Sequence, residues 1–370
     1  MQTNISYYFR TFEELRTKKQ LPFTDKYHIL DTINKQGELA LFHNPSGHKD
    51  KEVCQILAIV NGDVAGCVNC FSSRLSINGI EYHAQSASNL YVQDDYRKFG
   101  LGAELLMYIK DLHPTKNVIV AGISQMALPM YRILKYKLLK MPRYIFLRKS
   151  RCAVQSVLKN EGKATKATFA ITVVLDGLLW IHRSLLALFT KFRNRSITVE
   201  RAIAIPDNIS EMSANDGSSF MEVHDKKWFE WSLNYTLSMD SRNKKDFFLI
   251  RKKDKVIGFF MTKIEYNEAA GGGKFKDIYL GSVMEWGVLP DVQLSELDIQ
   301  LLAIQSFPND IDGVQIASAN DKVQKKLRRL GLFHVGDTYM GFRFQTNKVD
   351  GIDDIHKWRM RLATGDTIIN

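Results

Sequence analysis

The run Tyr96-Arg97-Lys98-Phe99-Gly100-Leu101-Gly102 decides how this chain is interpreted. It lies between a predicted strand, residues 89–92, and a predicted amphipathic helix, residues 103–112. The two glycines let the backbone turn without a Cβ, so that successive N–H groups can point at one anion. The helix adds roughly half a positive charge at its first turn, and Arg97 and Lys98 add whole charges. We therefore expect a diphosphate-binding turn, with an ordinary strand-to-helix turn as the alternative.

Length and charge extend this interpretation. A chain of 370 residues exceeds the size at which one hydrophobic core usually stops growing, so two domains are expected. The net charge of +11 is uneven, at +7 for residues 1–150, +6 for 151–198 and −2 for 199–370. The basic part therefore contains the glycine turn. The positive electrostatic field of this basic part favours binding of a polyanion. Nucleotide phosphates, anionic lipid and nucleic acid are all candidates. Since no nucleic-acid-reading motif accompanies the charge, we do not expect nucleic acid.

The four cysteines are too few for a disulfide scaffold in a chain of this length. Cys67 and Cys70 have metal-ligand spacing, but no second pair follows, and both lie in an apolar strand pattern. We therefore expect no metal site. Because no cleavable signal opens the sequence, we expect a reducing, cytoplasmic location.

A segment rich in Leu, Ile, Val and Phe runs from Thr168 to Phe192. Asp176, His182 and Arg183 interrupt it before it reaches the roughly 18 uncharged apolar residues typical of a membrane span. On a helical wheel, one narrow stripe contains Thr172, Asp176, Arg183 and Thr190, and apolar side chains are spread over the rest. We expect this helix to pack between two domains. The alternative is a helix that contacts the membrane peripherally through residues 168–195, helped by nearby cations.

The sequence contains two halves with one plan. Residues 55–148 predict two hairpins, a strand to Val92, the glycine turn, and then helix, strand, helix and strand. The second half repeats this order with a nearly constant shift, in which Gly66 matches Gly258 and Val92 matches Val288. The expected parts are a first domain at 1–150, a basic, hydrophobic helical connector at 151–198, a second domain at 199–346 and a tail at 347–370.

The two halves differ at the glycine turn. The second-half positions of Arg97, Gly100 and Gly102 are Gln293, Glu296 and Asp298. Carboxylates at these positions should repel a diphosphate. Ser295 is instead predicted to cap an ordinary helix, whose dipole favours acids in its first turn. We therefore expect only the first half to bind the anion.

At this point the sequence resembles the GCN5-related N-acetyltransferase superfamily. There, a strand ending Leu-x-Val, an Arg or Gln followed by x-x-Gly-x-Gly or Ala, and a helix bind acyl coenzyme A. The matching residues here are Leu90, Val92, Arg97, Gly100 and Gly102. The resemblance covers residues 50–150 and, as a fold pattern without the signature, residues 200–346. It implies an α/β (α+β) fold of two tandem domains, each a mixed, mostly antiparallel sheet flanked by helices, with a degenerate second copy.

The resemblance also implies a donor site. The strand at residues 84–92 is expected to splay from the strand at 117–124 and to lend backbone groups to the pantetheine arm of acetyl-CoA or another acyl-CoA. A backbone N–H near the middle of the first strand would stabilise the oxyanion as an amine attacks the thioester. The expected donor-binding residues are Leu90, Tyr91, Val92, Arg97, Lys98, Phe99, Gly100, Leu101, Gly102 and Ala103.

Tyr131 is the candidate acid for the leaving thiolate, because family members often keep a tyrosine near the coenzyme A sulfur. A phenol with a pKa near 10 is matched to that task. The alternative is a tyrosine packed in the core. The second-half residue at this position is Leu327, so packing there needs no hydroxyl.

The base that accepts the amine proton is less defined. Many relatives place a glutamate before the glycine turn, but this strand has none. Either the amine enters neutral, or a water held by Ser88 or Asn89 relays the proton, or the base comes from elsewhere, with Glu81, His83 and the N-terminal segment as candidates. Glu285 occupies the second-half position of Asn89 and is expected to be structural.

The leading hypothesis is an acyl-CoA-dependent N-acyltransferase, with acetyl-CoA as the expected donor. It would transfer the acyl group directly to a small or surface-exposed amine. The first alternative is a noncatalytic module that binds acyl-CoA or another anion. The second is a transferase that uses another donor and acts on aminoacyl-tRNA or on peptide or polysaccharide precursors.

Overall fold

The computed structural model describes residues 3–112, 116–151, 154, 166–214, 217–236, 240–269, 275–344 and 349–365. Parts of the expected connector and of the expected tail lie outside these residues. The chain forms two compact units. Unit 1 contains residues 1–140, 217–239 and 338–370, and unit 2 contains residues 141–216 and 240–337.

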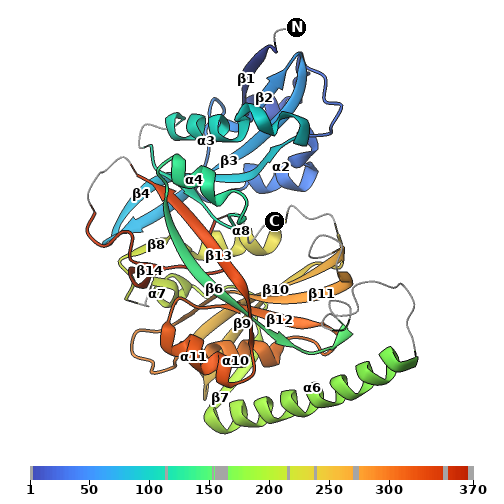
Figure 1. The fold of residues 1–370 in the computed structure, drawn as a ribbon. Coiled ribbons are helices and arrows are strands. Elements are labelled where there is room, and N and C mark those ends of the chain that lie inside the picture. The colour runs from blue at the N-terminus through green and yellow to red at the C-terminus, as the bar shows by residue number, and fades with distance from the viewer. Residues whose placement is uncertain are drawn as a thin grey trace. The chain divides into compact units, whose positions relative to one another are not determined.

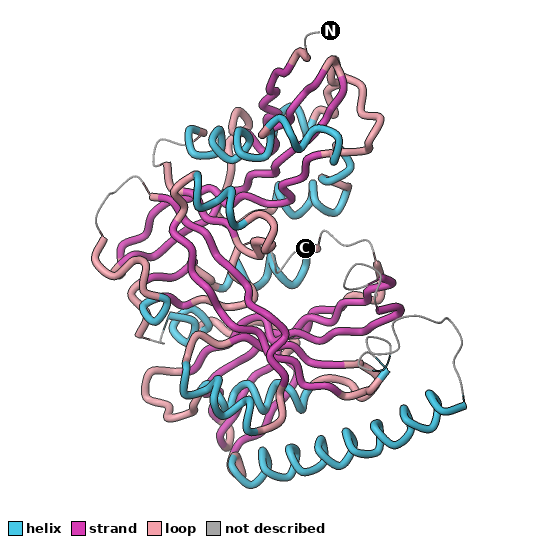
Figure 2. Tube along the Cα trace, viewed as in Figure 1, coloured by secondary structure: helices cyan, strands magenta, loops and turns pink. Residues whose placement is uncertain are grey.

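Unit 1 contains a sheet in the order β1-β2-β3-β4-β5-β13, which Figures 1 and 2 show with its helices. Neighbouring strands are antiparallel except for the parallel pair β4 and β5. Its elements are β1 (Ile5–Thr11), α1 (Phe12–Arg16), η1 (Leu30–Thr32), α2 (Lys35–Phe42), β2 (Val53–Val60), β3 (Asp63–Ile77), β4 (Ile80–Val92), η2 (Asp94–Phe99), α3 (Leu101–Asp111), β5 (Val118–Val120), α4 (Leu128–Ile133), β8 (Phe220–Glu222), α8 (Lys226–Asn234), η3 (Ile355–Lys357) and β14 (Trp358–Arg359).

The hairpins of unit 1 follow from local sequence. Asn61-Gly62 and Asn78-Gly79 all adopt positive φ, as two-residue hairpin turns require. Both turns were predicted and both are confirmed. Helices α3 and α4 then pack one face of the sheet through a cluster that includes Leu105. This packing fixes where α3 begins relative to the end of β4.

Unit 2 has a sheet in the order β6-β12-β11-β10-β9-β7, in which only β11 and β12 are parallel. Buried side chains of α6, α10 and α11 join its core on one face. Its elements, with the two strands that pass between units, are β6 (Lys137–Leu147), α6 (Lys166–Arg193), β7 (Ile197–Arg201), α7 (Ile209–Ala214), β9 (Lys244–Lys252), β10 (Lys255–Ala269), β11 (Phe275–Val288), α10 (Glu296–Ser306), β12 (Gly313–Ala317), α11 (Asp321–Arg329) and β13 (Phe333–Arg343).

Two strands each begin in one unit and end in the other. Strand β6 starts in unit 1, and its residues 143–147 pair with β12 of unit 2. Strand β13 starts in unit 2, and its residues 341–343 pair with β5 of unit 1. The units therefore differ from the domains expected with boundaries at residues 150 and 199. The physical reason is that each sheet is completed by a strand from the distant part of the chain.

Candidate functional site

The glycine turn has the local geometry expected of it. Residues 94–99 form the short helix η2, Gly100 adopts the left-handed conformation (φ +75°, ψ 11°), and α3 starts at Leu101. An added Cβ on Gly100 would meet nothing within 4 Å, so the surroundings of this corner are open. Because the first amides of a helix have no acceptor within it, those of Leu101 and Gly102 are available to an anion.

Gly102 lies where α3, α4 and β4 meet. An added Cβ would lie 3.5 Å from Met130 Sδ and 3.7 Å from Val92 Cγ2, which are ordinary contact distances. A small residue such as alanine therefore fits at this position, whereas a long side chain does not. The space at Gly102 therefore accommodates one methyl group in ordinary van der Waals contact.

The cations of the turn are engaged within the protein. Arg97 Nε donates to the carbonyl oxygen of Val92 at 3.2 Å, and Arg97 Nη2 lies 2.7 Å from Asp94 Oδ1. Lys98 Nζ lies 5.3 Å from the centre of the Phe99 ring. Arg97 therefore ties the end of β4 to η2, and Asp94 competes with an incoming diphosphate for the guanidinium. The sequence analysis counted the Arg97 charge but missed this competitor three residues away.

A bulge interrupts β4 before the glycine turn. Cys67 pairs with Tyr91 and Asn69 pairs with Ser88, so Asn89 and Leu90 have no partner in the β3 register. Asn89 has φ +48°, an unusual conformation for a residue other than glycine. Bulges of this kind redirect backbone groups and recur beside active sites. The bulge includes Asn89 and directly follows Ser88, the two residues predicted to hold a relay water.

Strands β4 and β5 pair over only three residues each, 85–87 with 118–120. Beyond Val120 the chain turns away through Gly122, which has φ +66°. The end of β4, including the bulge, therefore runs on without β5 beside it. This end of the pairing after residues 87 and 120 agrees with the splay expected from the resemblance.

The expected site residues of β4 differ in exposure. Ser88 is buried, Asn89 and Leu90 are half-buried, and Tyr91 is exposed and donates from its hydroxyl to Gln93 Oε1 at 2.7 Å. Ser86, which the sequence analysis did not select, is fully buried, and its hydroxyl has no hydrogen-bond partner. Buried hydroxyls normally have partners, so this face of β4 carries unused hydrogen-bonding capacity.

Tyr131 lies in α4 and is 3% exposed. It belongs to the same core cluster as Val92 of β4 and Val120 of β5. Its ring packs edge-on against Tyr136, with centroids 5.2 Å apart. Tyr131 is therefore a packed core residue at the right place in the fold, and its role as an acid stays a prediction.

Two of the candidate bases are too far from the bulge. Glu81 lies about 26 Å along β4 from Asn89, and His83 about 20 Å, at roughly 3.3 Å per residue. Glu81 is also exposed and lies 3.6 Å from Arg74. A general base must lie within hydrogen-bond reach of its proton, so neither residue serves an amine that is bound at the bulge itself.

Unit 2 uses its acidic residues structurally. Ser295 caps α10 by accepting from the Asp298 amide, as predicted. The Asp298 carboxylate accepts hydrogen bonds from Arg193 of α6 and from Ser295. Glu285 is fully buried in β11 and accepts from the Trp286 amide at 2.9 Å. These contacts hold unit 2 together, and they leave a carboxylate where unit 1 has an open glycine corner.

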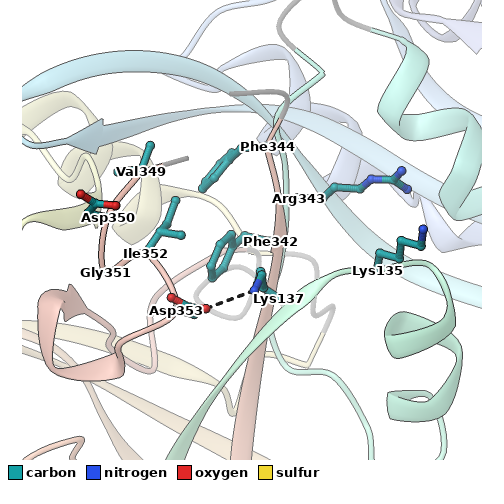
Figure 3. A pocket seen from close by; sticks show the side chains of 10 residues that line it. All are labelled: Lys135, Lys137, Phe342, Arg343, Phe344, Val349, Asp350, Gly351, Ile352 and Asp353. Atoms are coloured by element: carbon teal, nitrogen blue, oxygen red, sulfur yellow. Dashed lines mark hydrogen bonds and ion pairs between the residues drawn. The ribbon is translucent and has the colours of Figure 1, made fainter. Parts of the chain in front are cut away.

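A cavity of about 480 Å³ in unit 1 is lined by cations and aromatic rings (Figure 3). Lys137 lies 3.1 Å from Asp353, and Arg343 Nη1 donates to the Leu134 carbonyl at 3.1 Å. Arg343 pairs with Val118, at the opposite end of β5 from the bulge. The lining residues are Lys135, Lys137, Phe342, Arg343, Phe344, Val349, Asp350, Gly351, Ile352 and Asp353.

The cysteines of β3 are buried, and their thiols stay protonated and unreactive at neutral pH. Burial raises the pKa of the Cys67 thiol to about 11 and that of Cys70 well above its usual value. Among the residues that the structure describes, no group of three or more His, Cys, Asp or Glu side chains could hold a metal ion.

The sequence analysis missed one buried cluster near the splay. Glu222 of β8 accepts hydrogen bonds from Ser73 Oγ at 2.6 Å and from the Gly365 amide at 2.7 Å. An added Cβ on Gly365 would lie 2.7 Å from the Cβ of Ala121, directly after β5. The segment at 358–365 is therefore fastened beside the end of β5. Nothing in the local sequence of Glu222 indicates this contact, because its partners come from distant segments.

No protein-family model matches the chain, and no curated protein matches its sequence. Solved structures do match its fold. Saccharomyces cerevisiae N-myristoyltransferase with bound myristoyl-CoA has a TM-score of 0.53 at 12% identity, covering 91% of this chain and 82% of that one. A GCN5-related N-acetyltransferase from Anabaena variabilis has a TM-score of 0.52 at 12% identity, covering 92% and 73%. A probable N-acyltransferase from Enterococcus faecalis has a TM-score of 0.50 at 12% identity, covering 93% and 73%. This chain therefore has the GCN5-related N-acetyltransferase-like fold, in a mixed sheet flanked by helices.

Proposed function

We propose that this protein is an acyl-CoA-dependent N-acyltransferase, with acetyl-CoA as the first donor to test. One observation carries the proposal: the open Gly100 corner and the bulge at Asn89 and Leu90 lie at the end of the same strand, where β5 turns away. The solved structures of like fold include a transferase with bound myristoyl-CoA, which supports an acyl-CoA donor without fixing its chain length.

In this proposal the chain supplies positioning and electrostatics. The amides of Leu101 and Gly102 hold the diphosphate, and Arg97 contributes its charge once it exchanges Asp94 for phosphate oxygens. The β4 backbone beyond Ala87 pairs with the pantetheine arm. A bulge N–H stabilises the oxyanion as the amine nitrogen bonds to the thioester carbon.

Two protons then move. The thiolate leaves as its carbon–sulfur bond breaks and takes a proton from the Tyr131 hydroxyl. The amine attacks in its neutral form, which it has on entry or reaches by giving a proton to a water held by Ser88 or Asn89. The further proton that the nitrogen loses as the amide forms passes through water to the Tyr131 phenolate and restores its hydroxyl. Direct transfer needs no protein nucleophile, in agreement with the raised thiol pKa values of Cys67 and Cys70.

We also infer that unit 2 is a second, degenerate copy of the same architecture. Gly66 pairs with Val92 in unit 1, and Gly258 pairs with Val288 in unit 2. Both glycines lie against backbone, since an added Cβ would be 2.9 Å from the Tyr91 carbonyl oxygen and 2.7 Å from that of Gly287. The acids at the start of α10 then explain why only unit 1 is assigned the donor.

Isothermal titration of the full chain with acetyl-CoA tests the first step. We expect binding to the native protein and at least tenfold weaker binding in a Gly100→Glu, Gly102→Glu variant. Gly79→Glu is the matched control, because Gly79 also has positive φ (+81°) and open surroundings but lies in a hairpin turn at the other end of β4. Absence of heat with the native protein, or equal loss in the control, would overturn the donor site.

The second candidate is a noncatalytic acyl-CoA-binding module. It is favoured by the position of Glu81 far from the bulge and by the Asp94–Arg97 pair. Incubation with labelled acetyl-CoA and a panel of amines separates the two. Transfer to any amine supports the enzyme, whereas tight binding without transfer or thioester hydrolysis supports the module.

A further inference from the structure

Helix α6 presents an apolar face to solvent. It runs for 28 residues, about 42 Å at 1.5 Å per residue, and Figure 1 shows it as one continuous helix. Large apolar side chains along it are 41–72% exposed, and these are Phe169, Ile171, Val173, Val174, Leu178, Trp180, Ile181, Leu185, Leu188, Phe189 and Phe192. At 100° per residue they occupy an arc of about 200°. The apolar side of this helix is thus exposed, and packing between two domains stays a prediction.

The side of α6 opposite this arc, here called its polar stripe, contains Asp176, His182 and Arg193. It faces the rest of unit 2. Asp176 Oδ1 accepts from the Ser150 amide at 2.6 Å near one end of the helix. His182 Nε2 lies 2.8 Å from the Leu330 carbonyl oxygen in the middle. At the other end, Arg193 pairs with Asp298, and Leu186 is buried in the core of unit 2. The helix is thus fastened lengthwise, with its polar stripe inward and its apolar arc outward.

These contacts decide how the helix can meet a bilayer. By length and composition Phe169–Arg193 could cross a membrane, contrary to the sequence-based expectation. A spanning helix, however, would have to give up Asp176, His182 and Arg193 contacts or carry unit 2 into hydrocarbon, where unpaired polar groups are costly. A helix that lies in the plane of the membrane surface keeps all three.

The shape and charge of the face favour anionic lipid over a second copy of the chain. A packed helix pair buries an apolar stripe of roughly 100°, which would leave much of this arc in water. Insertion at a membrane surface covers a wider arc. Residues 151–198 carry a net charge of +6, and exposed Lys191 and Arg195 stand at the end of the arc beside Phe192. Such cations attract anionic headgroups.

We propose that α6 docks the protein onto an anionic membrane surface, with its outer arc in the headgroup–acyl boundary and its polar stripe on unit 2. This inference does not depend on the proposed transferase activity. Trp180 is 60% exposed on the arc and would enter the headgroup–acyl boundary, so its fluorescence would report the insertion.

Vesicle flotation of the full chain tests the proposal, with phosphatidylcholine vesicles containing or lacking phosphatidylserine. We expect binding that increases with phosphatidylserine and falls with salt, and at least tenfold weaker partitioning in a Leu178→Glu, Leu185→Glu variant. Ile80→Glu, Ile203→Glu is the matched control, because it adds the same charges at exposed apolar positions away from α6 and should bind as the native protein does. Lys191→Glu, Arg195→Glu should lose the preference for phosphatidylserine.

Three outcomes would overturn the proposal. Equal loss of vesicle binding in the Leu178→Glu, Leu185→Glu variant and in the Ile80→Glu, Ile203→Glu control would show a general charge effect. Absence of vesicle binding together with a dimer that the Leu178→Glu, Leu185→Glu variant converts to a monomer would make α6 an interface between copies. Retention in membranes after alkaline carbonate washing would indicate a spanning helix. Release by carbonate, with quenching of tryptophan fluorescence by brominated lipid that Trp180→Phe abolishes, supports the in-plane arrangement.

Discussion

Val120 of β5 lies opposite Gly341 of β13, so the last residue of a short central strand is paired with a residue near the other end of the chain. An added Cβ on Gly341 would lie 2.9 Å from Ile123 Cδ1 and 3.4 Å from Leu138 Cδ2, which shows how closely β13 packs in unit 1. The sheet that carries the candidate site is therefore incomplete without a distant strand.

A fragment of residues 1–150 should accordingly fail to fold by itself. It lacks β13, β8 and α8, which unit 1 needs to cover its sheet. We expect circular dichroism of the fragment to show no cooperative thermal transition, in contrast to the full chain. A sharp transition in the fragment would show that the pairing of β5 with β13 is dispensable.

Replacing Asp94 by asparagine should tighten acetyl-CoA binding. The change removes the partner that lies 2.7 Å from Arg97 and one negative charge beside the glycine turn. An exposed ion pair contributes about 0.2–1 kcal/mol, so we expect a gain of roughly 1.4-fold to fivefold, measured by isothermal titration. Asp95→Asn is the control, since it removes the same charge from the next exposed position. Weaker binding by Asp94→Asn would mean that the Asp94 pair holds the turn in its binding conformation.

Tyr131→Phe tests the proposed acid. If the hydroxyl protonates the thiolate, turnover should fall about 10²-fold or more while the melting temperature stays near that of the native protein. Tyr136→Phe is the control, because it removes a neighbouring tyrosine hydroxyl that is buried and has no hydrogen-bond partner. Its loss should leave turnover unchanged. Full activity in Tyr131→Phe would assign this residue to packing alone.

Gly66→Ala and Gly258→Ala should both destabilise the fold, because each new methyl group would press on a carbonyl oxygen of the neighbouring strand. Crowding of this kind costs about 1–3 kcal/mol, measurable by urea denaturation. Gly177→Ala is the control, since a methyl group there meets nothing within 4 Å on a helix and should stabilise by up to about 1 kcal/mol. Neutral behaviour at both strand glycines would weaken the inferred duplication.

Because of Lys245, the free energy of unfolding should rise as the pH increases from neutral to alkaline values. Burial and the charge of Lys263, directly opposite, together lower the pKa of Lys245 to about 7, while Glu265 opposes the shift. Since the unfolded chain, with a pKa of 10.5 for this group, binds more protons between about pH 7 and 10.5, stability should rise with pH across that window. Melting temperatures at pH 7 to 9 should show the rise, and Lys245→Met should flatten it. The control Lys244→Met, at the exposed neighbouring position, should retain the slope.

Local backbone geometry followed from the sequence more closely than side-chain contacts did. The glycine corner, the two hairpin turns and the Ser295 cap follow from residue types that favour one local backbone geometry, and all four are confirmed. The donor residues chosen from the resemblance lie together around the end of β4. The engagement of Arg97 by Asp94 could also have been predicted, because the two lie at a spacing that brings side chains together in a helical turn.

The sequence by itself determined where this chain turns, where its strands pair as hairpins and where one helix begins with open amides, because positive φ and side-chain alternation are properties of a few adjacent residues. The tertiary structure alone decided which strand completes each sheet, that Glu222 fastens residue 365, and that the polar stripe of α6 faces inward. These features depend on contacts between distant segments, whose free energies no local pattern contains.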